Sequence, residues 1–230
     1  MGEMVSFPSN GGTTDGYLAV PATGTGPGIV VIQEWWGLVG HVTSIADRFA
    51  AEGFVALAPD LYHGARTGEP DEAMRLMMGL AMDQAAKDMA GAARYLAKRP
   101  ECSGAVGTVG FCMGGSLALW SAALSDELSA AVGFYPAIPW ERMNPKWDKY
   151  AGKSAVIHCS EADGTSAAPG IQTAKQAIEA AGGECTLYDY PGTNHAFFND
   201  DRPEVYDHDA STVAWARTLE LFRTKLSARN

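Results

Sequence analysis

The length, composition and charge of this chain exclude several classes of protein. Its 230 residues, 47% hydrophobic and 19% charged, are typical of a single globular domain and not of a disordered chain. A net charge of −10 without a Lys- and Arg-rich stripe argues against nucleic acid as a partner. The first ten residues lack the apolar run of a signal peptide, and the longest aliphatic stretch, at 29–32, is too short to span a membrane.

We therefore expect residues 1–230 to form one domain of a cytoplasmic protein, a monomer or small homo-oligomer, with no membrane partner. Its four cysteines are Cys102, Cys112, Cys159 and Cys185. They show neither a C-x-x-C pair nor metal-ligand spacing. We expect neither a disulfide framework nor a metal site.

Short apolar runs alternate with amphipathic stretches along the chain. The pattern predicts, in chain order, a strand at 28–33, a helix at 40–53, a strand at 54–59, a helical stretch at 70–99 broken near Met82, a strand at 105–111, a helix at 113–125, strands at 130–136 and 154–160, a helix at 168–181, a strand at 184–190 and a terminal helix from about Val205. This alternation predicts an α/β fold, with a mostly parallel sheet and helices on both faces. Ligands of such sheets bind beyond the carboxyl ends of the strands, so the residues there are the candidates for function.

The sequence GFCMGG at 110–115 places Cys112 where a predicted strand ends and a helix begins. This is the spacing of a G-x-nucleophile-x-G elbow, with Cys in place of Ser. Side chains two positions before and after the nucleophile would collide with neighbouring backbone, which explains Gly110 and Gly114. The helix N-terminus favours a thiolate and an oxyanion at this point. We predict that Cys112 is a nucleophile and not simply a small buried hydrophobic residue.

A nucleophile at such an elbow needs a base and an acid that orients the base, in the chain order acid and then histidine. The segment YPGTNHAF places His195 directly after the last predicted strand, where the base belongs. The acid comes from SEADG at 160–164, which offers both Asp163 and Glu161. We favour Asp163, because it lies further from the strand end and beside Gly164.

The first long strand ends in QEWWG at 33–37. The loop after this strand supplies the second oxyanion-hole donor in elbow enzymes, beside the N–H of the residue that follows the nucleophile. We therefore assign the two donors to the backbone N–H groups of Trp35 and Met113. Glu34 precedes the first donor and would project near Cys112. Its position alone is equally consistent with an ordinary loop glutamate that has no catalytic role.

Taken together, these segments resemble the dienelactone hydrolases, cysteine-dependent members of the α/β-hydrolase fold. The resemblance covers nearly the whole chain, and its markers are QEWWG (33–37), APDLYHG (58–64), GFCMGG (110–115), VGFYP (132–136), SEADG (160–164) and YPGTNHAF (190–197). It implies a single-domain α/β-hydrolase fold, a Cys112–His195–Asp163 triad and hydrolysis of an ester or lactone through a thioester. It also implies that Glu34 contacts the resting thiol and takes its proton once substrate displaces it. This chemistry needs no cofactor.

The chain departs from the family at the arginines that hold a substrate carboxylate. Asn199 stands four residues after His195, where the family has one of these arginines. Arg66, Arg75 and Arg202 are nearby substitutes, although solvated surface charges are an equal interpretation. The acid loop DGTSAAP is also longer than usual. We therefore expect a preference for uncharged esters or lactones.

Aromatic side chains after several strands are expected to line an apolar substrate pocket. The main candidates are Trp36, Phe111, Tyr135 and Phe197, and about half of this aromatic group is expected to be ordinary core. Two other functional classes remain open from the residues. One is a thiol-based binding or sensor protein on a hydrolase scaffold, and the other is a cysteine peptidase.

Overall fold

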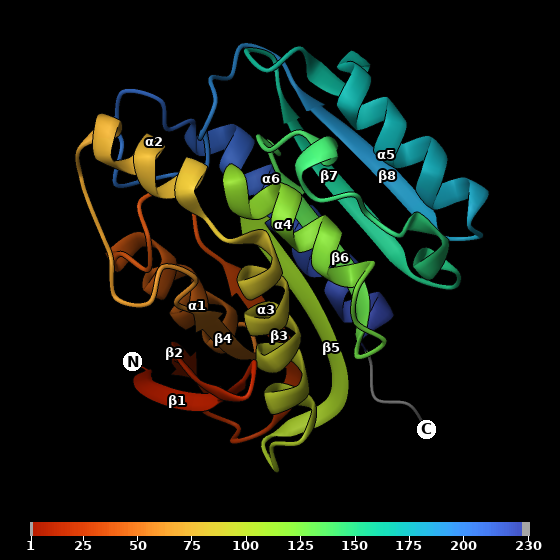
Figure 1. Cartoon of the computed structure of the whole chain (residues 1–230). Helices are drawn as coiled ribbons and strands as arrows, with labels where there is room; N and C mark the ends of the chain where they lie inside the picture. The colour runs from red at the N-terminus through yellow and green to blue at the C-terminus, as the bar shows by residue number, and fades with distance from the viewer. Residues whose placement is uncertain (1, 227–230) are drawn as a thin grey trace.

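The backbone of the chain forms one eight-stranded sheet, seen in a computed structural model that describes residues 2–226 (Figure 1). Its strands are β1 (Glu3–Ser9), β2 (Gly12–Ala19), β3 (Gly26–Ile32), β4 (Val55–Pro59), β5 (Cys102–Phe111), β6 (Leu128–Phe134), β7 (Ser154–Ser160) and β8 (Glu184–Tyr190). The strand order is β1-β2-β4-β3-β5-β6-β7-β8. The strands from β4 to β8 in this order run parallel, and β1 and β2 form an antiparallel edge. The predicted α/β class with a mostly parallel sheet is confirmed.

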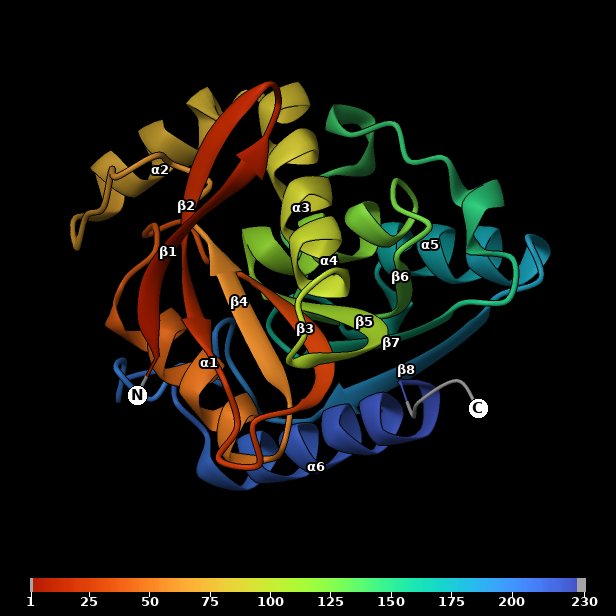
Figure 2. The same cartoon turned by 90° about the horizontal axis from the view of Figure 1, so that it is seen from below.

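Helices cover both faces of this sheet. They are α1 (Gly40–Ala51), α2 (Pro70–Gly79), α3 (Met82–Ala97), α4 (Met113–Ala122), α5 (Pro169–Ala180) and α6 (His208–Lys225). Figure 2 shows α1 and α6 on one side of the sheet, with α3, α4 and α5 on the other. Among the described residues, no helix is both long enough and apolar enough to cross a membrane.

Most predicted elements are present, with shifts of a few residues at their ends. The helical stretch at 70–99 is interrupted between Gly79 and Met82, as expected. The terminal helix begins at His208, three residues later than predicted, where the Asp207 side chain accepts a hydrogen bond from the N–H of Ala210. The N-terminal hairpin β1–β2 was not predicted. Buried and exposed positions are mixed in both strands, and β1 contains a proline, so neither gives the continuous apolar run of a buried strand.

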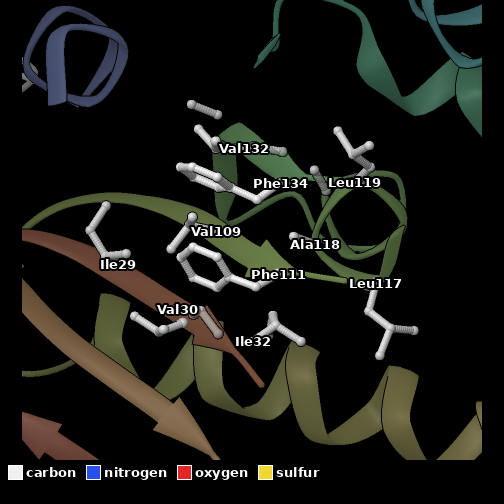
Figure 3. Close-up of a cluster of buried hydrophobic side chains, with 14 of the residues drawn as sticks. Ile29, Val30, Ile32, Val109, Phe111, Leu117, Ala118, Leu119, Val132 and Phe134 are labelled. Atoms are coloured by element: carbon white, nitrogen blue, oxygen red, sulfur yellow. The ribbon is translucent and has the colours of Figure 1, made fainter. Parts of the chain in front are cut away.

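The core lies between the central strands and the helices on either side, and Figure 3 shows part of it. Phe111, at the end of β5, is fully buried in this core. Its ring stacks on Phe134 at 4.7 Å and on Phe198 at 5.3 Å. Successive strand residues point to opposite faces of a sheet, so Phe111 is turned into the core. The expectation that Phe111 lines a substrate pocket is therefore corrected.

A buried carboxylate fastens the N-terminal hairpin to the rest of the fold. Asp88 of α3 has no exposed surface. Its Oδ1 accepts hydrogen bonds from the hydroxyls of Ser9 and of Thr14, the latter at 2.7 Å. The Gln84 amide donates to the same oxygen at 2.9 Å, and Oδ2 lies 2.9 Å from Nε2 of His63. One side chain thus links β1, β2, α3 and the loop after β4.

Candidate active site

The elbow at Cys112 has the strained backbone that its sequence predicts. Cys112 has φ 56° and ψ −119°, a left-handed conformation that is unusual for a residue with a side chain. A Cβ at Gly110 would overlap the carbonyl oxygen of Gly114, and a Cβ at Gly114 would overlap that of Gln33. A Cβ at Gly115 would lie 2.5 Å from the carbonyl oxygen of Phe134. The glycines therefore let β3, β5, β6 and α4 close around the thiol.

His195 and Asp163 lie together at the carboxyl ends of β7 and β8. Nδ1 of His195 is 2.8 Å from Oδ2 of Asp163, and both side chains are about a third exposed. The Ser160 hydroxyl donates to the same carboxylate oxygen at 2.5 Å. Glu161, the alternative acid, instead accepts the N–H of Gly192 at 2.8 Å. The geometry therefore favours Asp163 as the partner of the histidine.

The electrostatics of this pair hold a proton on the imidazole. Burial alone would lower the pKa of His195, but the hydrogen bond with Asp163 and the neighbouring Cys112 outweigh burial and raise this pKa to about 10. Burial alone would raise the pKa of Asp163, yet its bonds with His195 and Ser160 bring it below its usual value. His195 and Cys112 line the same pocket, so the carboxylate, the imidazole and the thiol are gathered at one site.

Glu34 lies on the wall of the same pocket as Cys112 and is only 2% exposed. Its Oε2 accepts a hydrogen bond from Nδ2 of Asn199 at 2.7 Å, while its Oε1 has no partner among the described residues. Burial raises the pKa of Glu34, and the charge of His41 and the Asn199 bond offset only part of that rise. In the described hydrogen bonds Glu34 is paired with Asn199.

In the sequence, Asn199 is notable only because it stands where the family has an arginine. In the structure, its side-chain amide is held in one place by hydrogen bonds at both ends. Its side chain is 2% exposed. While Nδ2 donates to Glu34, Oδ1 accepts the N–H of Asp201 at 3.1 Å. Both ends of the amide are thereby fixed, so Asn199 holds Glu34 in one orientation. A contact between residues so far apart in the chain leaves no local signal in the sequence.

The backbone N–H groups of Trp35 and Met113 are the two donors that the sequence assigns to an oxyanion hole. Met113 is the first residue of α4, whose N–H has no acceptor inside the helix. None of the described hydrogen bonds uses either N–H group. Both residues follow strands that are neighbours in the sheet, β3 and β5. The two donors predicted from sequence are therefore available beside Cys112.

A pocket of about 200 Å³ contains the thiol. Its walls are Glu34, Trp35, Trp36, Met77, Cys112, Ala137, His195, Ala196 and Arg202. Sequence reasoning did not name Met77, Ala137 and Ala196, which are apolar residues that carry no distinctive pattern. Of the other aromatic candidates, Phe197 is fully buried, and Tyr135 is 1% exposed with its ring 5.0 Å from that of His195. Phe197 is therefore core, and Tyr135 supports the histidine.

One of the three candidate arginines reaches this pocket. Arg202 lies 5.9 Å from the centre of a Trp36 ring, and its Nε donates to Glu204 at 2.9 Å. Arg66 and Arg75 are exposed and do not line the pocket, and Arg75 pairs with Glu72 one helical turn away. Arg66 and Arg75 are thus placed as surface charges.

A group with metal-ligand side chains lies outside this pocket. His41, Asp200 and Asp201 carry ligand-type atoms within 4.8 Å of one another, the one such group among the described residues. Nδ1 of His41 is 3.1 Å from Asp200, which also faces Arg48 at 3.8 Å. His41 and Arg48 are thus both paired with Asp200, and this group takes no part in the proposed reaction.

Comparisons with known proteins agree with this geometry. The sequence profile of the dienelactone hydrolase family matches residues 14–226. The chain belongs to the dienelactone hydrolase family. This assignment confirms the resemblance seen in the sequence, the class of ester and lactone hydrolases, and the α/β-hydrolase fold.

The alignments of this dienelactone hydrolase family member with individual relatives cover nearly its whole length. It is 35% identical to "Protein usf" of Aquifex pyrophilus, over 99% of this chain and 100% of that protein. It is 32% identical to a "Putative carboxymethylenebutenolidase" of Aquifex aeolicus, over 98% of this chain and 100% of that protein. A crystal structure described as "Putative Dienelactone Hydrolase" from Klebsiella pneumoniae superimposes with a TM-score of 0.82 at 26% identity, covering 96% of this chain and 98% of the other.

Proposed function

We propose that this protein hydrolyses a carboxylic ester or lactone through Cys112, His195 and Asp163, with a thioester acyl-enzyme. The observation that carries this proposal is the hydrogen bond between Asp163 and His195, with His195 on the same pocket wall as a cysteine held at a strained elbow. Nucleophile, base and orienting acid are the three parts that such catalysis requires.

In the proposed reaction the sulfur of Cys112 attacks the carbonyl carbon, and a C–S bond forms. The N–H groups of Trp35 and Met113 hold the oxyanion, and one such donor is typically worth about 3 kcal/mol of barrier. The C–O bond to the alcohol then breaks, and His195 gives its proton to the departing oxygen. His195 next takes a proton from water, whose oxygen attacks the thioester carbon. The C–S bond then breaks, which releases the acid and leaves Cys112 as a thiolate.

Glu34 is proposed to accept the proton of the resting Cys112 thiol. Its raised pKa and its unpaired Oε1 suit a carboxylate that accepts a proton at the pocket wall. Asn199 is proposed as the positioning residue, because its bond to Oε2 leaves the other oxygen available. The thiol, freed of its proton, is then the nucleophile that His195 stabilises by its charge.

The decisive experiment measures hydrolysis of p-nitrophenyl acetate together with the mass of the intact protein. We expect esterase activity and a transient acetyl adduct on Cys112, both lost in Cys112→Ala. The matched controls Cys102→Ala, Cys159→Ala and Cys185→Ala should keep most of the activity. Burial raises the pKa values of Cys159 and Cys185 to about 12, so neither supplies a thiolate at neutral pH.

The two alternative classes give different results in the same experiment. A peptidase would cleave a peptide substrate as well as the ester, and a thiol sensor would turn over neither substrate while still reacting with iodoacetamide. Wild-type turnover by Cys112→Ala would overturn the proposed mechanism.

The proposed substrate carries no carboxylate. Arg202 is the one lysine or arginine that lines the Cys112 pocket among the described residues, and Glu204 already pairs with it. An unpaired carboxylate entering the pocket beside Glu34 would lose hydration without a free partner. We expect kcat/KM to be higher for a neutral ester than for an analogue with a carboxylate. A preference for the acidic analogue that disappears in Arg202→Gln would instead make Arg202 its anchor.

A further inference from the structure

A second and larger pocket opens beside the one that contains the thiol. This side pocket has a volume of about 430 Å³, against about 200 Å³ for the Cys112 pocket. It lies between residues 135–141, which follow β6, and residues 168–173 at the start of α5, with Cys159, Asp163 and Thr165 at its base and rim. Its volume is within the range of pockets that hold whole small molecules.

The side pocket adjoins the proposed catalytic centre. Ala137 lines both pockets, and its N–H donates to the carbonyl oxygen of Cys112 at 3.2 Å. Asp163 lines the side pocket, whereas its partner His195 lines the Cys112 pocket. Tyr135 joins the two, since it lines the side pocket and its ring contacts the His195 ring.

The walls of the side pocket favour an uncharged, apolar occupant. Ile138, Trp140 and Ile171 provide apolar surface, and burial raises the pKa of the Cys159 thiol to about 12, which keeps it neutral. The charged groups on the wall are the carboxylates of Glu141 and Asp163, and no lysine or arginine is among the lining residues. A carboxylate or phosphate would be repelled here.

The same walls are held in place before any substrate arrives. Nε1 of Trp140 donates to the carbonyl oxygen of Gly170 at 2.7 Å, which ties one wall to the other. The buried hydroxyl of Ser116 accepts the N–H of Ile138 at 2.9 Å and donates to its carbonyl oxygen at 3.1 Å. Tyr135 and Thr165 both have positive φ, 37° and 61°, a strain typical of functional loops. Walls that are already ordered lose little conformational entropy when a ligand binds. This pocket is therefore better suited to binding than an ordinary depression of the surface.

The position of His195 decides which part of the substrate would enter. In the proposed reaction the oxygen that leaves receives its proton from His195, whereas the carbonyl oxygen binds the N–H groups of Trp35 and Met113. The two residues that contact His195, Tyr135 and Asp163, line the side pocket, whereas Trp35 lines the Cys112 pocket. We propose that the side pocket binds an uncharged cyclic or aromatic alcohol portion of the ester, a proposal that rests on the function proposed above. The smaller acyl portion then occupies the Cys112 pocket.

The test uses acetates that share one acyl group and differ in the alcohol: ethyl acetate, benzyl acetate and naphthylmethyl acetate. Ala168→Trp, directly before α5, fills the side pocket, and its matched control is Ala180→Trp, at the other end of α5 and not among the lining residues. We expect Ala168→Trp to lower the ratio of kcat/KM for benzyl to ethyl acetate by about tenfold or more, the size of a lost apolar contact in a pocket. Ala180→Trp should leave the ratio unchanged.

A second variant enlarges the pocket and guards against misfolding of the first. Ile171→Ala should raise the ratio of kcat/KM for naphthylmethyl to benzyl acetate. An unchanged ratio in both variants would overturn the proposal. So would a selective loss with ethyl phenylacetate, in which the acyl portion is the bulky one.

Binding of free benzyl alcohol, followed by ligand-observed NMR, separates this proposal from the proposed reaction. We expect saturable binding that Ala168→Trp weakens and Ala180→Trp does not. Absence of such binding in a protein that hydrolyses ethyl acetate would overturn the side pocket alone. Binding without hydrolysis of any ester would overturn the proposed function and leave the pocket.

Discussion

Two buried carboxylates of this protein are treated in opposite ways by the side chains around them. Asp88 has both oxygens bonded, and its four partners come from β1, β2, α3 and the loop after β4. Glu34 has one oxygen bonded to Asn199 and the other without a partner among the described residues. A fully bonded carboxylate holds elements together. A half-bonded one on a pocket wall keeps the capacity to accept a proton.

The difference follows from what each arrangement costs. A buried polar atom without a hydrogen bond typically loses about 1–3 kcal/mol of stability, so folding alone would not select the arrangement at Glu34. Such unsatisfied groups in native proteins call for an explanation in function. If the comparison is correct, changes at Glu34 alter catalysis more than stability, and changes at Asp88 alter stability more than catalysis.

The largest effect is expected for Glu34→Gln, which keeps the shape of the side chain and removes its charge. Loss of a positioned proton acceptor typically costs about 10²- to 10³-fold, and we expect kcat/KM for p-nitrophenyl acetate to fall by that amount. Alkylation of Cys112 by iodoacetamide at neutral pH should become faster, because a nearby negative charge disfavours the thiolate. Unchanged turnover together with unchanged alkylation would reduce Glu34 to a structural residue.

Next in size is Asp88→Ala, which leaves Ser9, Thr14, Gln84 and His63 without their common acceptor. We expect the free energy of unfolding to fall by about 3 kcal/mol, as for other buried networks that lose one member. Turnover per folded molecule should not change, because Asp88 is remote from the thiol pocket. Denaturant titration and active-site titration together measure both quantities. A loss of turnover without a loss of stability would break the comparison.

A smaller effect is expected when the side-chain amide that donates a hydrogen bond to each carboxylate is removed. Asn199→Leu removes the donor to Glu34, and a hydrogen bond to a charged group is worth about 1.5 kcal/mol, so kcat/KM should fall by about tenfold. Gln84→Leu is the matched change at Asp88, and it should cost stability without affecting kcat/KM. The same pair of assays reports both variants. Equal kinetic losses in the two would show that the effect at Asn199 is merely structural.

The smallest expected effect is on the pH dependence of stability. Burial raises the folded-state pKa of Glu34 above its ordinary value of 4.5. The folded state therefore binds the Glu34 proton more tightly, and the stability this contributes is complete below pH 4.5 and is lost as pH rises through the folded pKa. Melting temperatures of wild type and Glu34→Gln, measured upward from about pH 4.5, should diverge in favour of the variant. Parallel curves would contradict the raised pKa.

The sequence was most informative where function depends on local spacing. The elbow around Cys112 and the positions of His195 and Asp163 each depend on a short segment at the end of one strand. The contact of Asn199 with Glu34 was not predicted, because it spans 165 residues and leaves no periodic signal. Phe111 was misplaced because an apolar run of a doubly buried strand does not reveal which side chain faces the core.

The edge hairpin escaped prediction for a different reason. Its strands mix buried and exposed positions, and what holds them in place includes Asp88, a residue about 80 positions away. Acidic residues in helices are common on surfaces, so nothing in the local sequence marks Asp88 as buried. Long-range polar contacts of this kind are visible only once the chain has folded.

The backbone conformation at Cys112 also limits how this site can change over generations. The strain is stored in the main chain, at φ 56°, and the crowding that maintains it involves the glycines around the turn. A mutation of the cysteine codon to serine would exchange sulfur for oxygen and leave the reacting atom in its place. A mutation at Gly110, Gly114 or Gly115 would push two strands and a helix apart. Lineages that inherit this elbow are therefore expected to vary the nucleophile more readily than the turn that presents it.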